Sequence, residues 1–261
     1  MRIGLLGEKL SHSLSPKIHN YIYNYLNKNI NYELFEISQE KIKDFQQFML
    51  NEHIDAVNIT IPYKKNFLNT LHQISENAKK IGAINLMYIK DGKFYGENTD
   101  YYGFRYTLEK NKVNVEDKKI FILGKGGASL SVQAVLKDLG ATDINLVFRE
   151  NKQSPITFNN IYGDIIINTT PVGMYPNINE NLVPENILSN FNIAIDLIYN
   201  PLETKFLKQA SLLGLKTING LDMLIEQAIK TDEILFNRTF DIHLRDELQV
   251  LLTNHFLGVK K

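Results

Sequence analysis

The chain has 261 residues, of which 44% are hydrophobic and 22% are charged, enough apolar material for one large domain or two modest ones. Its 29 basic residues balance its 29 acidic residues, which disfavours a nucleic-acid partner recognised through bulk positive charge. Cysteine is absent, which excludes disulfides, thiolate metal sites and cysteine nucleophiles. Since no apolar run approaches the roughly 20 residues of a membrane span and the first residues turn polar too early for a signal peptide, we expect a cytoplasmic protein without a membrane partner.

Short apolar runs alternate with helical patterns in the first hundred residues. Asp91-Gly92 lies between two such runs and is the strongest short signal for a hairpin. The patterns predict strands over 2–6, 31–37, 56–61, 86–89 and 93–95, and helices over 16–27, 39–50 and 62–72.

A second alternating series follows a change in character near residues 99–102. It predicts strands over 119–123, 144–148, 164–168, 193–197 and 216–218, and helices over 101–110, 127–139, 202–213, 220–236 and 241–255. Such alternation is typical of α/β domains with parallel sheets and right-handed crossovers. The connection over 150–163 is about a dozen residues long, close to the minimum for a parallel crossover.

A glycine-rich turn, GKGGAS at 124–129, stands between a predicted strand and a predicted helix. Gly124 permits a tight turn, Gly126 lets the backbone approach a pyrophosphate, and Ser129 is small enough for close helix–strand packing. The N–H groups at the start of the helix favour phosphate. The segment therefore predicts a dinucleotide site, the alternative being a merely tight turn, and Lys125 either adds a phosphate contact or is solvated.

The end of the next strand carries Arg149 followed by Glu150, about 20 residues on, where a dinucleotide's ribose 2′ group is read. Arginine suits a 2′-phosphate and hence NADP, whereas an acidic residue suits the 2′-hydroxyl of NAD. The two neighbours leave the choice open, and a solvated ion pair is the third possibility.

Two hydroxyls, Ser13 and Ser15, precede the first predicted helix at a spacing that suits a small carboxylate. The alternative is ordinary helix capping by Ser15. His12 and His19 lack a carboxylate or cysteine at ligand spacing, so we expect surface or core histidines and no metal site.

Lys64 lies just beyond a predicted strand, and Asp100 lies at the expected domain junction. In open α/β sheets, ligands bind at the carboxyl ends of strands. A lysine and a carboxylate brought together suit a carbonyl/alcohol interconversion, in which the lysine exchanges a proton with the oxygen while hydride moves at carbon. Taken singly, each residue is best interpreted as a solvated charge, and the spacing along the chain does not show that the two meet.

Nearly the whole chain resembles the shikimate/quinate dehydrogenase family. The segments that carry the resemblance are HSLSPKIHN (12–20), NITIPYK (58–64), GAIN (82–85), NTDYYG (98–103), GKGGAS (124–129), NTTPVGM (168–174), DLIYNP (196–201), NGLDML (219–224) and Gln227-Ala228.

The resemblance implies reversible, NADP-dependent reduction of 3-dehydroshikimate to shikimate, in the biosynthesis of aromatic amino acids. Its implied catalytic pair is Lys64 and Asp100, both also touching substrate. For substrate it implies Ser13, Ser15 and Tyr199 at the carboxylate, and Thr60, Asn85, Asp100 and Gln227 at the ring hydroxyls. For the cofactor it implies Gly124, Gly126, Gly127, Ala128 and Ser129 at the diphosphate, Arg149 at the 2′-phosphate, and Thr169, Val172, Leu197, Gly220 and Met223 toward the nicotinamide.

The resemblance also implies two α/β domains: a substrate domain over 1–101 plus 237–261, to which the C-terminal helix returns, and a Rossmann-like domain over 102–236. Three features depart from the family pattern: Lys125 in the glycine turn, Phe148-Arg149-Glu150 after the second strand, and the short 150–163 connection. The alternatives are an NAD-accepting quinate/shikimate dehydrogenase and a non-catalytic dinucleotide-binding regulator. We expect a monomer or a homodimer.

Overall fold

The computed structural model describes residues 1–149, 158 and 161–258. They form two compact units, one comprising Met1–Gly103 with Ile225–Val250 and the other Phe104–Leu224 with Leu251–Lys261. Among these described residues, no helix combines the length and the apolar character needed to cross a membrane.

The first unit is built on a six-stranded sheet in the order β2-β1-β3-β5-β6-β4. Its strands are β1 (Ile3–Gly7), β2 (Tyr32–Glu36), β3 (Ala56–Ile59), β4 (Gln73–Ile74), β5 (Leu86–Lys90) and β6 (Lys93–Glu97). β1 is parallel to β2 and β3, but β5 is antiparallel to both β3 and β6. The sheet is therefore mixed: the alternation of strands and helices predicts its parallel part, and the predicted hairpin accounts for the antiparallel pairing of β5 with β6. At the predicted Asp91-Gly92 turn both residues have positive φ, 50° and 70°, as a two-residue hairpin requires, and the chain reverses.

Several helices pack on this sheet, and most of them lie where the periodicity of apolar residues predicts a helix. They are α1 (Ser15–Tyr25), η1 (Ile42–Asp44), α2 (Phe45–Asn51) and α3 (Glu76–Ile81). Three more helices are divided between the units: α4 (Asp100–Lys110) begins in the first unit, α8 (Leu221–Phe236) enters it at Ile225, and α9 (Ile242–Phe256) leaves it after Val250. The helix predicted over 62–72 is wrong, because this stretch is a series of turns leading into β4. α3 was not predicted, although Ser75 caps its start by accepting from the Ala78 N–H at 3.2 Å and Gly82 ends it at φ 69°.

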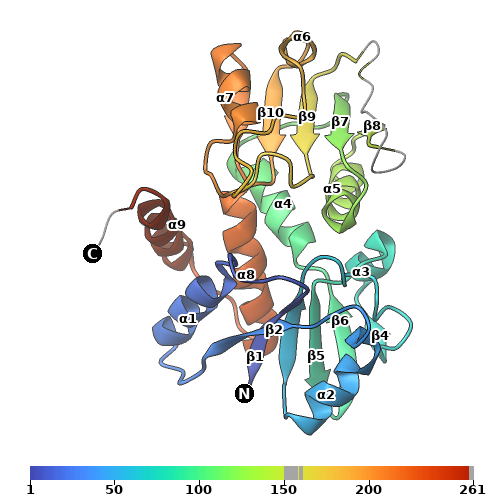
Figure 1. Cartoon of the computed structure of the whole chain (residues 1–261), viewed down its shortest axis with the longest axis vertical. Coiled ribbons are helices and arrows are strands. Elements are labelled where there is room, and N and C mark those ends of the chain that lie inside the picture. The colour runs from blue at the N-terminus through green and yellow to red at the C-terminus, as the bar shows by residue number, and fades with distance from the viewer. Residues whose placement is uncertain (150–157, 159–160, 259–261) are drawn as a thin grey trace. The chain divides into compact units, whose positions relative to one another are not determined.

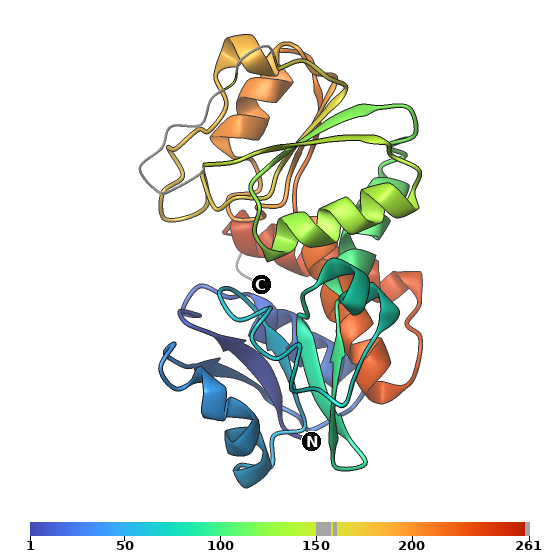
Figure 2. The ribbon, with the colours of Figure 1, turned by 90° about the vertical axis from the view of Figure 1, so that its right-hand side faces the viewer.

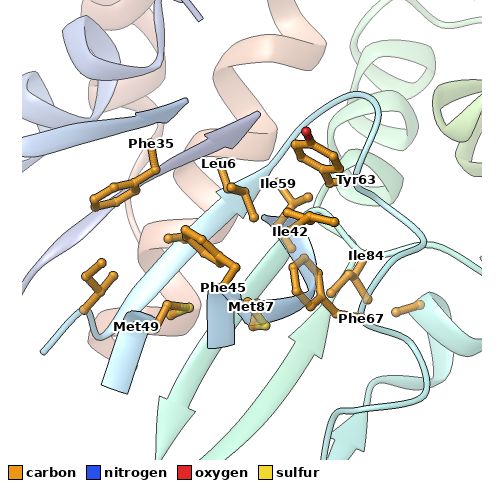
Figure 3. Packing of buried hydrophobic residues seen from close by; sticks show 13 residues of the cluster. Leu6, Phe35, Ile42, Phe45, Met49, Ile59, Tyr63, Phe67, Ile84 and Met87 are labelled. Atoms are coloured by element: carbon orange, nitrogen blue, oxygen red, sulfur yellow. The ribbon is translucent and has the colours of Figure 1, made fainter. Parts of the chain in front are cut away.

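The two faces of the first sheet carry separate cores, because successive strand residues point to opposite sides. Leu6 packs in a cluster with Phe35, Phe45 and Tyr63 on the side of α2, as Figure 3 shows. Leu5, its neighbour, packs on the other side in a cluster that includes residues of α1 and α8. Because both faces of the sheet are covered at β1, every residue of this strand is buried.

The second unit is built on a five-stranded sheet in the order β11-β10-β9-β7-β8, and every strand pair in it is parallel. Its strands are β7 (Lys119–Leu123), β8 (Asp143–Val147), β9 (Ile165–Asn168), β10 (Ile193–Asp196) and β11 (Lys216–Ile218). α5 (Gly127–Asp138) covers one face, while α6 (Glu185–Leu188) and α7 (Lys205–Leu212) cover the other (Figure 2). This arrangement confirms the Rossmann-like expectation. Most of the short 150–163 connection lies outside the described residues.

Most of α8 and α9 belongs to the first unit, and both helices contact α1, which confirms that the C-terminal helix returns to this unit (Figure 1). His19 of α1 pairs with Asp232 of α8, and the Tyr21 hydroxyl donates to the Glu247 carboxylate of α9 at 3.0 Å.

The His19–Asp232 pair is fully enclosed. Nδ1 of His19 lies 2.8 Å from Oδ2 of Asp232, and the two side chains are 1% and 0% exposed. Burial raises the pKa of Asp232, and the adjacent imidazole opposes that rise. His19 also stacks on the Tyr32 ring at a centroid distance of 4.2 Å. The pair thus joins α1, α8 and β2 inside the unit.

We predict that His19→Ala lowers the free energy of unfolding by about 3–5 kcal/mol, because the buried Asp232 carboxyl loses its partner. Urea titration followed by circular dichroism measures the change, with His243→Ala, at an exposed position of α9, as the control. A loss no larger than that of the control would show that the pair does not stabilise the fold.

Candidate active site

One edge of the first sheet gathers the predicted substrate residues. β1 and β3 end at this edge, β6 ends there because it runs parallel to β3, and β5 begins there. The segments that cross the edge are 8–14, 60–64, 82–85 and 98–100. Backbone bonds tie them together: the Ile84 N–H donates to the Lys64 carbonyl at 2.8 Å, and the Asn85 N–H donates to the Glu97 carbonyl at 3.0 Å. Topology alone therefore brings together residues from distant parts of the sequence.

Lys64 and Asp100 meet at this edge. Nζ of Lys64 donates to Oδ2 of Asp100 in a short ion pair, with the side chains 14% and 9% exposed. Low exposure strengthens the interaction relative to a surface pair and limits the number of conformations of both side chains. The predicted solvated charges are in fact one paired group, with the ammonium still partly accessible.

Asn85 holds the other carboxylate oxygen. Its Nδ2 donates to Oδ1 of Asp100 at 2.9 Å, while its Oδ1 accepts from the Thr99 backbone N–H at 2.6 Å. Because the backbone N–H can only donate, the orientation of the Asn85 amide is defined. Asp100 is thus fixed at both oxygens, one by an amide and one by an ammonium.

The two predicted serines lie at the start of α1. The helix begins at Ser15, and its N-cap residue is Leu14, with no side-chain capping bond. The capping interpretation for Ser15 is therefore wrong; the Ser13 hydroxyl instead accepts from the Ser15 N–H at 3.2 Å. Partly exposed hydroxyls beside a helix start without a side-chain cap suit an anionic group. Thr60 is also partly exposed, and its N–H donates to the Leu6 carbonyl at 2.9 Å.

The last two predicted substrate residues fall in different units. Gln227, partly exposed on α8, belongs to the first unit, and its carbonyl accepts from the Thr231 hydroxyl at 3.0 Å. Tyr199 belongs to the second unit, where burial raises the pKa of its phenol. The structure therefore places Gln227, but not Tyr199, in the same unit as the Lys64–Asp100 pair.

The glycine turn of the second unit has the geometry that a dinucleotide requires. Gly124 has φ 105°, and a Cβ there would lie 2.9 Å from Oγ1 of Thr169, so a larger residue is excluded. A Cβ at Gly126 would meet nothing within 4 Å. α5 begins at Gly127 with no side-chain cap, and its first N–H groups therefore remain available to a phosphate. Ser129 is buried and closes the turn by donating to the Gly124 carbonyl at 2.9 Å.

Basic side chains accompany this turn. Nζ of Lys125 lies 4.3 Å from the centroid of the Phe148 ring, a cation–π contact that joins the turn to the end of β8. Arg149 follows and is exposed. Glu150, the acidic neighbour on which the NAD alternative rests, lies outside the described residues. The open glycine of the turn, the Lys125 side chain and the exposed Arg149 after β8 fit a phosphorylated dinucleotide.

The residues predicted toward the nicotinamide lie after β9, β10 and β11. Oγ1 of Thr169 donates to the Leu123 carbonyl at 2.6 Å, which ties the segment after β9 to the glycine turn. A Cβ at Gly220 would lie 2.0 Å from the Leu197 carbonyl oxygen, so the backbone after β11 is in direct contact with the backbone after β10. Val172 is partly exposed and Met223 is buried. All of these residues belong to the second unit.

A buried polar cluster that we did not predict positions these segments. Asn168, at the end of β9, donates to Oδ1 of Asp196 at 3.0 Å and accepts from the Thr170 N–H at 3.0 Å. Asp196, at the end of β10, also accepts from the Ile198 N–H at 3.0 Å and the Thr204 hydroxyl at 2.6 Å. Burial raises the pKa of Asp196 to about 6 in spite of these bonds. The available signal was an Asn and an Asp, each ending an otherwise apolar strand.

Comparison with known proteins gives concordant matches. Residues 5–87 match the family model for the shikimate dehydrogenase substrate binding domain. The chain is 44% identical to the NADP(+)-dependent shikimate dehydrogenase of Clostridium beijerinckii, over 97% of this chain and 98% of that one. It superimposes on shikimate dehydrogenase 1 of Peptoclostridium difficile with a TM-score of 0.90 at 39% identity, covering 98% and 99% of the two chains. The Thermus thermophilus enzyme in complex with NADP(H) and shikimate matches with a TM-score of 0.83 at 26% identity, covering 95% and 98%.

We predict that Asp196 makes stability fall as pH rises from about 4 to about 6. The unfolded aspartate ionises near 3.8 and the folded one near 6, so in this window the folded state holds the extra proton and loses its advantage as the proton leaves. Asp196→Asn flattens this slope in urea titrations at a series of pH values, whereas exposed Asp143→Asn leaves it in place. Parallel profiles for wild type and Asp196→Asn would contradict the assignment.

Proposed function

The chain belongs to the shikimate dehydrogenase family, and from that premise we propose that Lys64 and Asp100 carry out its proton chemistry. The enzyme reduces 3-dehydroshikimate reversibly to shikimate with NADPH, a reaction of aromatic amino-acid biosynthesis. The observation that supports the assignment is the short ion pair between Nζ of Lys64 and Oδ2 of Asp100, whose other oxygen is held by Asn85.

The reaction adds a hydride to the carbonyl carbon and a proton to the carbonyl oxygen. When bound, NADPH would supply the hydride. Lys64 donates the proton to the oxygen as negative charge develops there, and it takes the proton back from the alcohol in the reverse direction. Asp100 holds the ammonium in place and accepts from a neighbouring ring hydroxyl. Pre-positioning of the proton donor avoids part of the entropy cost of reaching the transition state.

Directional hydrogen bonds explain how a small polyhydroxylated acid is held. We assign the substrate carboxylate to Ser13 and Ser15, whose backbone places both hydroxyls at the uncapped start of α1. The ring hydroxyls are assigned to Thr60, Asn85, Asp100 and Gln227, and a role of Tyr199 near the carboxylate rests on the resemblance alone. Each buried bond that a wrong substrate leaves unmade costs about 1–3 kcal/mol, so the set provides selectivity.

The cofactor assignment rests on the glycine turn. Gly124, Gly126, Gly127, Ala128 and Ser129 would hold the diphosphate at the start of α5, Arg149 the 2′-phosphate, and Thr169, Val172, Leu197, Gly220 and Met223 the nicotinamide side. The open Gly126 and the exposed Arg149 support this placement. NADP is the cofactor, and use of NAD as well is the nearest alternative.

A non-catalytic regulator is disfavoured, since a sensor has no need of a paired and partly accessible lysine. We further propose that the reaction takes place in the cytoplasm and that the enzyme is a monomer or a homodimer. We propose domain boundaries near residues 101 and 236. The two compact units divide after Gly103 and, within α8, before Ile225, so the second proposed boundary lies farther along the chain than the division between the units.

We predict that Lys64→Ala lowers kcat by about 100- to 10,000-fold with a small change in KM, because proton transfer acts mainly in the transition state. Steady-state rates of NADPH oxidation measure the effect. Lys65→Ala removes the same charge from the exposed neighbouring position and is expected to retain wild-type turnover. Near-normal turnover of the Lys64 variant would remove lysine from the acid–base role.

We predict that Arg149→Ala raises KM for NADPH far more than KM for NADH, because only NADPH carries the 2′-phosphate. A matrix of initial rates measures this, with NADPH and NADH on dehydroshikimate and the oxidised cofactors on shikimate and quinate. Equal effects on both cofactors would mean that Arg149 does not read the phosphate. Comparable wild-type rates with NADH and with quinate would favour the NAD-accepting alternative, and an absence of turnover with tight NADP binding would favour the regulator.

A further inference from the structure

We propose that Thr231, on α8, is a positioning residue whose hydroxyl holds the Asn85–Asp100 hydrogen bond in its reactive arrangement. Thr231 is fully buried, and its Oγ1 lies within bonding distance of three groups from three different segments of the first unit. These are Nδ2 of Asn58 on β3 at 3.0 Å, Oγ1 of Thr99 before α4 at 3.2 Å, and the Gln227 carbonyl on α8 at 3.0 Å. The inference rests on the role proposed above for Lys64 and Asp100.

Counting hydrogens gives these bonds a single direction. A hydroxyl offers one hydrogen and accepts two. The Gln227 carbonyl can only accept, so the Thr231 hydrogen goes there, and the Thr231 oxygen accepts from Asn58 and from the Thr99 hydroxyl. Every bonding position of the Thr231 hydroxyl is then used once.

The orientation of Asn58 agrees with this count. Burial raises the pKa of Tyr32 far above its usual range, so the phenol keeps its proton and donates to Oδ1 of Asn58 at 2.7 Å. Nδ2 of Asn58 therefore points away from Tyr32 and donates one hydrogen to Thr231 and the other to the Asn85 carbonyl at 3.2 Å. No buried polar atom of this amide is left unpaired.

The chain of hydrogen bonds continues from Thr231 to the Asp100 carboxylate. The Thr99 hydroxyl has one hydrogen and two acceptors at 3.2 Å, Oγ1 of Thr231 and Oδ1 of Asn85. In the arrangement that we propose, the hydrogen goes to Thr231, and the Thr99 oxygen accepts from Nδ2 of Asn85 at 2.9 Å. The second hydrogen on that nitrogen goes to Oδ1 of Asp100 at 2.9 Å. Thr231 thus determines which way the Thr99 hydroxyl points, and thereby favours the Asn85 geometry that holds Asp100 against Lys64.

A hydroxyl at position 231 is needed for this chain of bonds, whereas the methyl group is not. Valine has nearly the shape of threonine but accepts no hydrogen bond. It would leave a hydrogen of Asn58 and the hydrogen of Thr99 without their acceptor, and the Thr99 hydroxyl would turn toward Oδ1 of Asn85, 3.2 Å away. Serine keeps the hydroxyl and loses only the methyl. The two substitutions therefore separate hydrogen bonding from packing.

The test compares Thr231→Val and Thr231→Ser in the full-length protein. The measurements are kcat and KM for shikimate, the solvent isotope effect on kcat, the Kd of NADPH from its fluorescence, and the urea midpoint. Thr70→Val makes the same chemical change at a hydroxyl that donates only to the Phe67 carbonyl, 3.0 Å away, and serves as the control. Tyr32→Phe removes the other bond that orients Asn58 and provides a second, independent variant.

We expect Thr231→Val to lower kcat by about 2- to 30-fold and to raise the solvent isotope effect, because proton transfer becomes slower with a misplaced carboxylate. The Kd of NADPH is expected to stay within about twofold of wild type, and Thr231→Ser to restore kcat to within about twofold. Tyr32→Phe is expected to change kcat in the same direction as Thr231→Val. Partial unfolding would reduce the amount of active enzyme without changing the isotope effect.

Three results would overturn the inference: wild-type kcat and isotope effect in Thr231→Val, equal losses in the Ser and Val variants, or a loss of kcat with an unchanged isotope effect. A Thr70→Val variant that behaves like Thr231→Val would also contradict it. The Lys64→Ala result separates the two proposals. If Lys64→Ala is inactive and Thr231→Val is normal, only the positioning role fails, whereas an active Lys64→Ala removes the acid–base assignment whatever Thr231 does.

Discussion

The ion pair between Lys64 and Asp100 is the interaction on which the proposed chemistry of this protein depends. Neither residue is unusual by itself, and the sequence separates them by a strand hairpin and a helix. The mixed sheet brings them together, because the end of β3, the start of β5 and the end of β6 share one edge. Low exposure then makes the pair more than a surface contact, since solvent screens it less.

The elements with a strong pattern were predictable from the sequence. The strands β7 and β11 begin and end where the apolar runs predict, and the Asp91-Gly92 turn forms the expected hairpin. The failures have physical causes. The stretch over 62–72 has helix-compatible residues, yet its backbone is used to carry Lys64 past the sheet edge in turns. The short α3 has too few residues for periodicity to show, and only its cap residues mark it.

The candidate site divides in the same way. Residues with a particular chemistry at the ends of predicted elements have a local signal. Gly124, the hydroxyl of Ser13 and the ammonium of Lys64 were therefore named from the sequence. Residues that act through other residues have a weaker signal or none: Asn168 and Asp196 each end an apolar strand, but their positions in the sequence do not reveal what they bind. Asn168 and Asp196 matter because two strands are neighbours in the sheet, and Thr231 because α8 packs on the face that carries Asn58. Such pairings depend on tertiary contacts, which the spacing of residues along the chain does not encode.

The first unit is discontinuous: it joins residues 1–103 to residues 225–250, while most of the second unit is the uninterrupted stretch between them. A ribosome makes the chain from the N-terminus, and contiguous units generally fold as they emerge. The Rossmann-like sheet therefore has all five of its strands before α8 leaves the exit tunnel. Asp232, the buried partner of His19, is synthesised after all five of these strands, and maturation of the substrate-binding unit must wait for it.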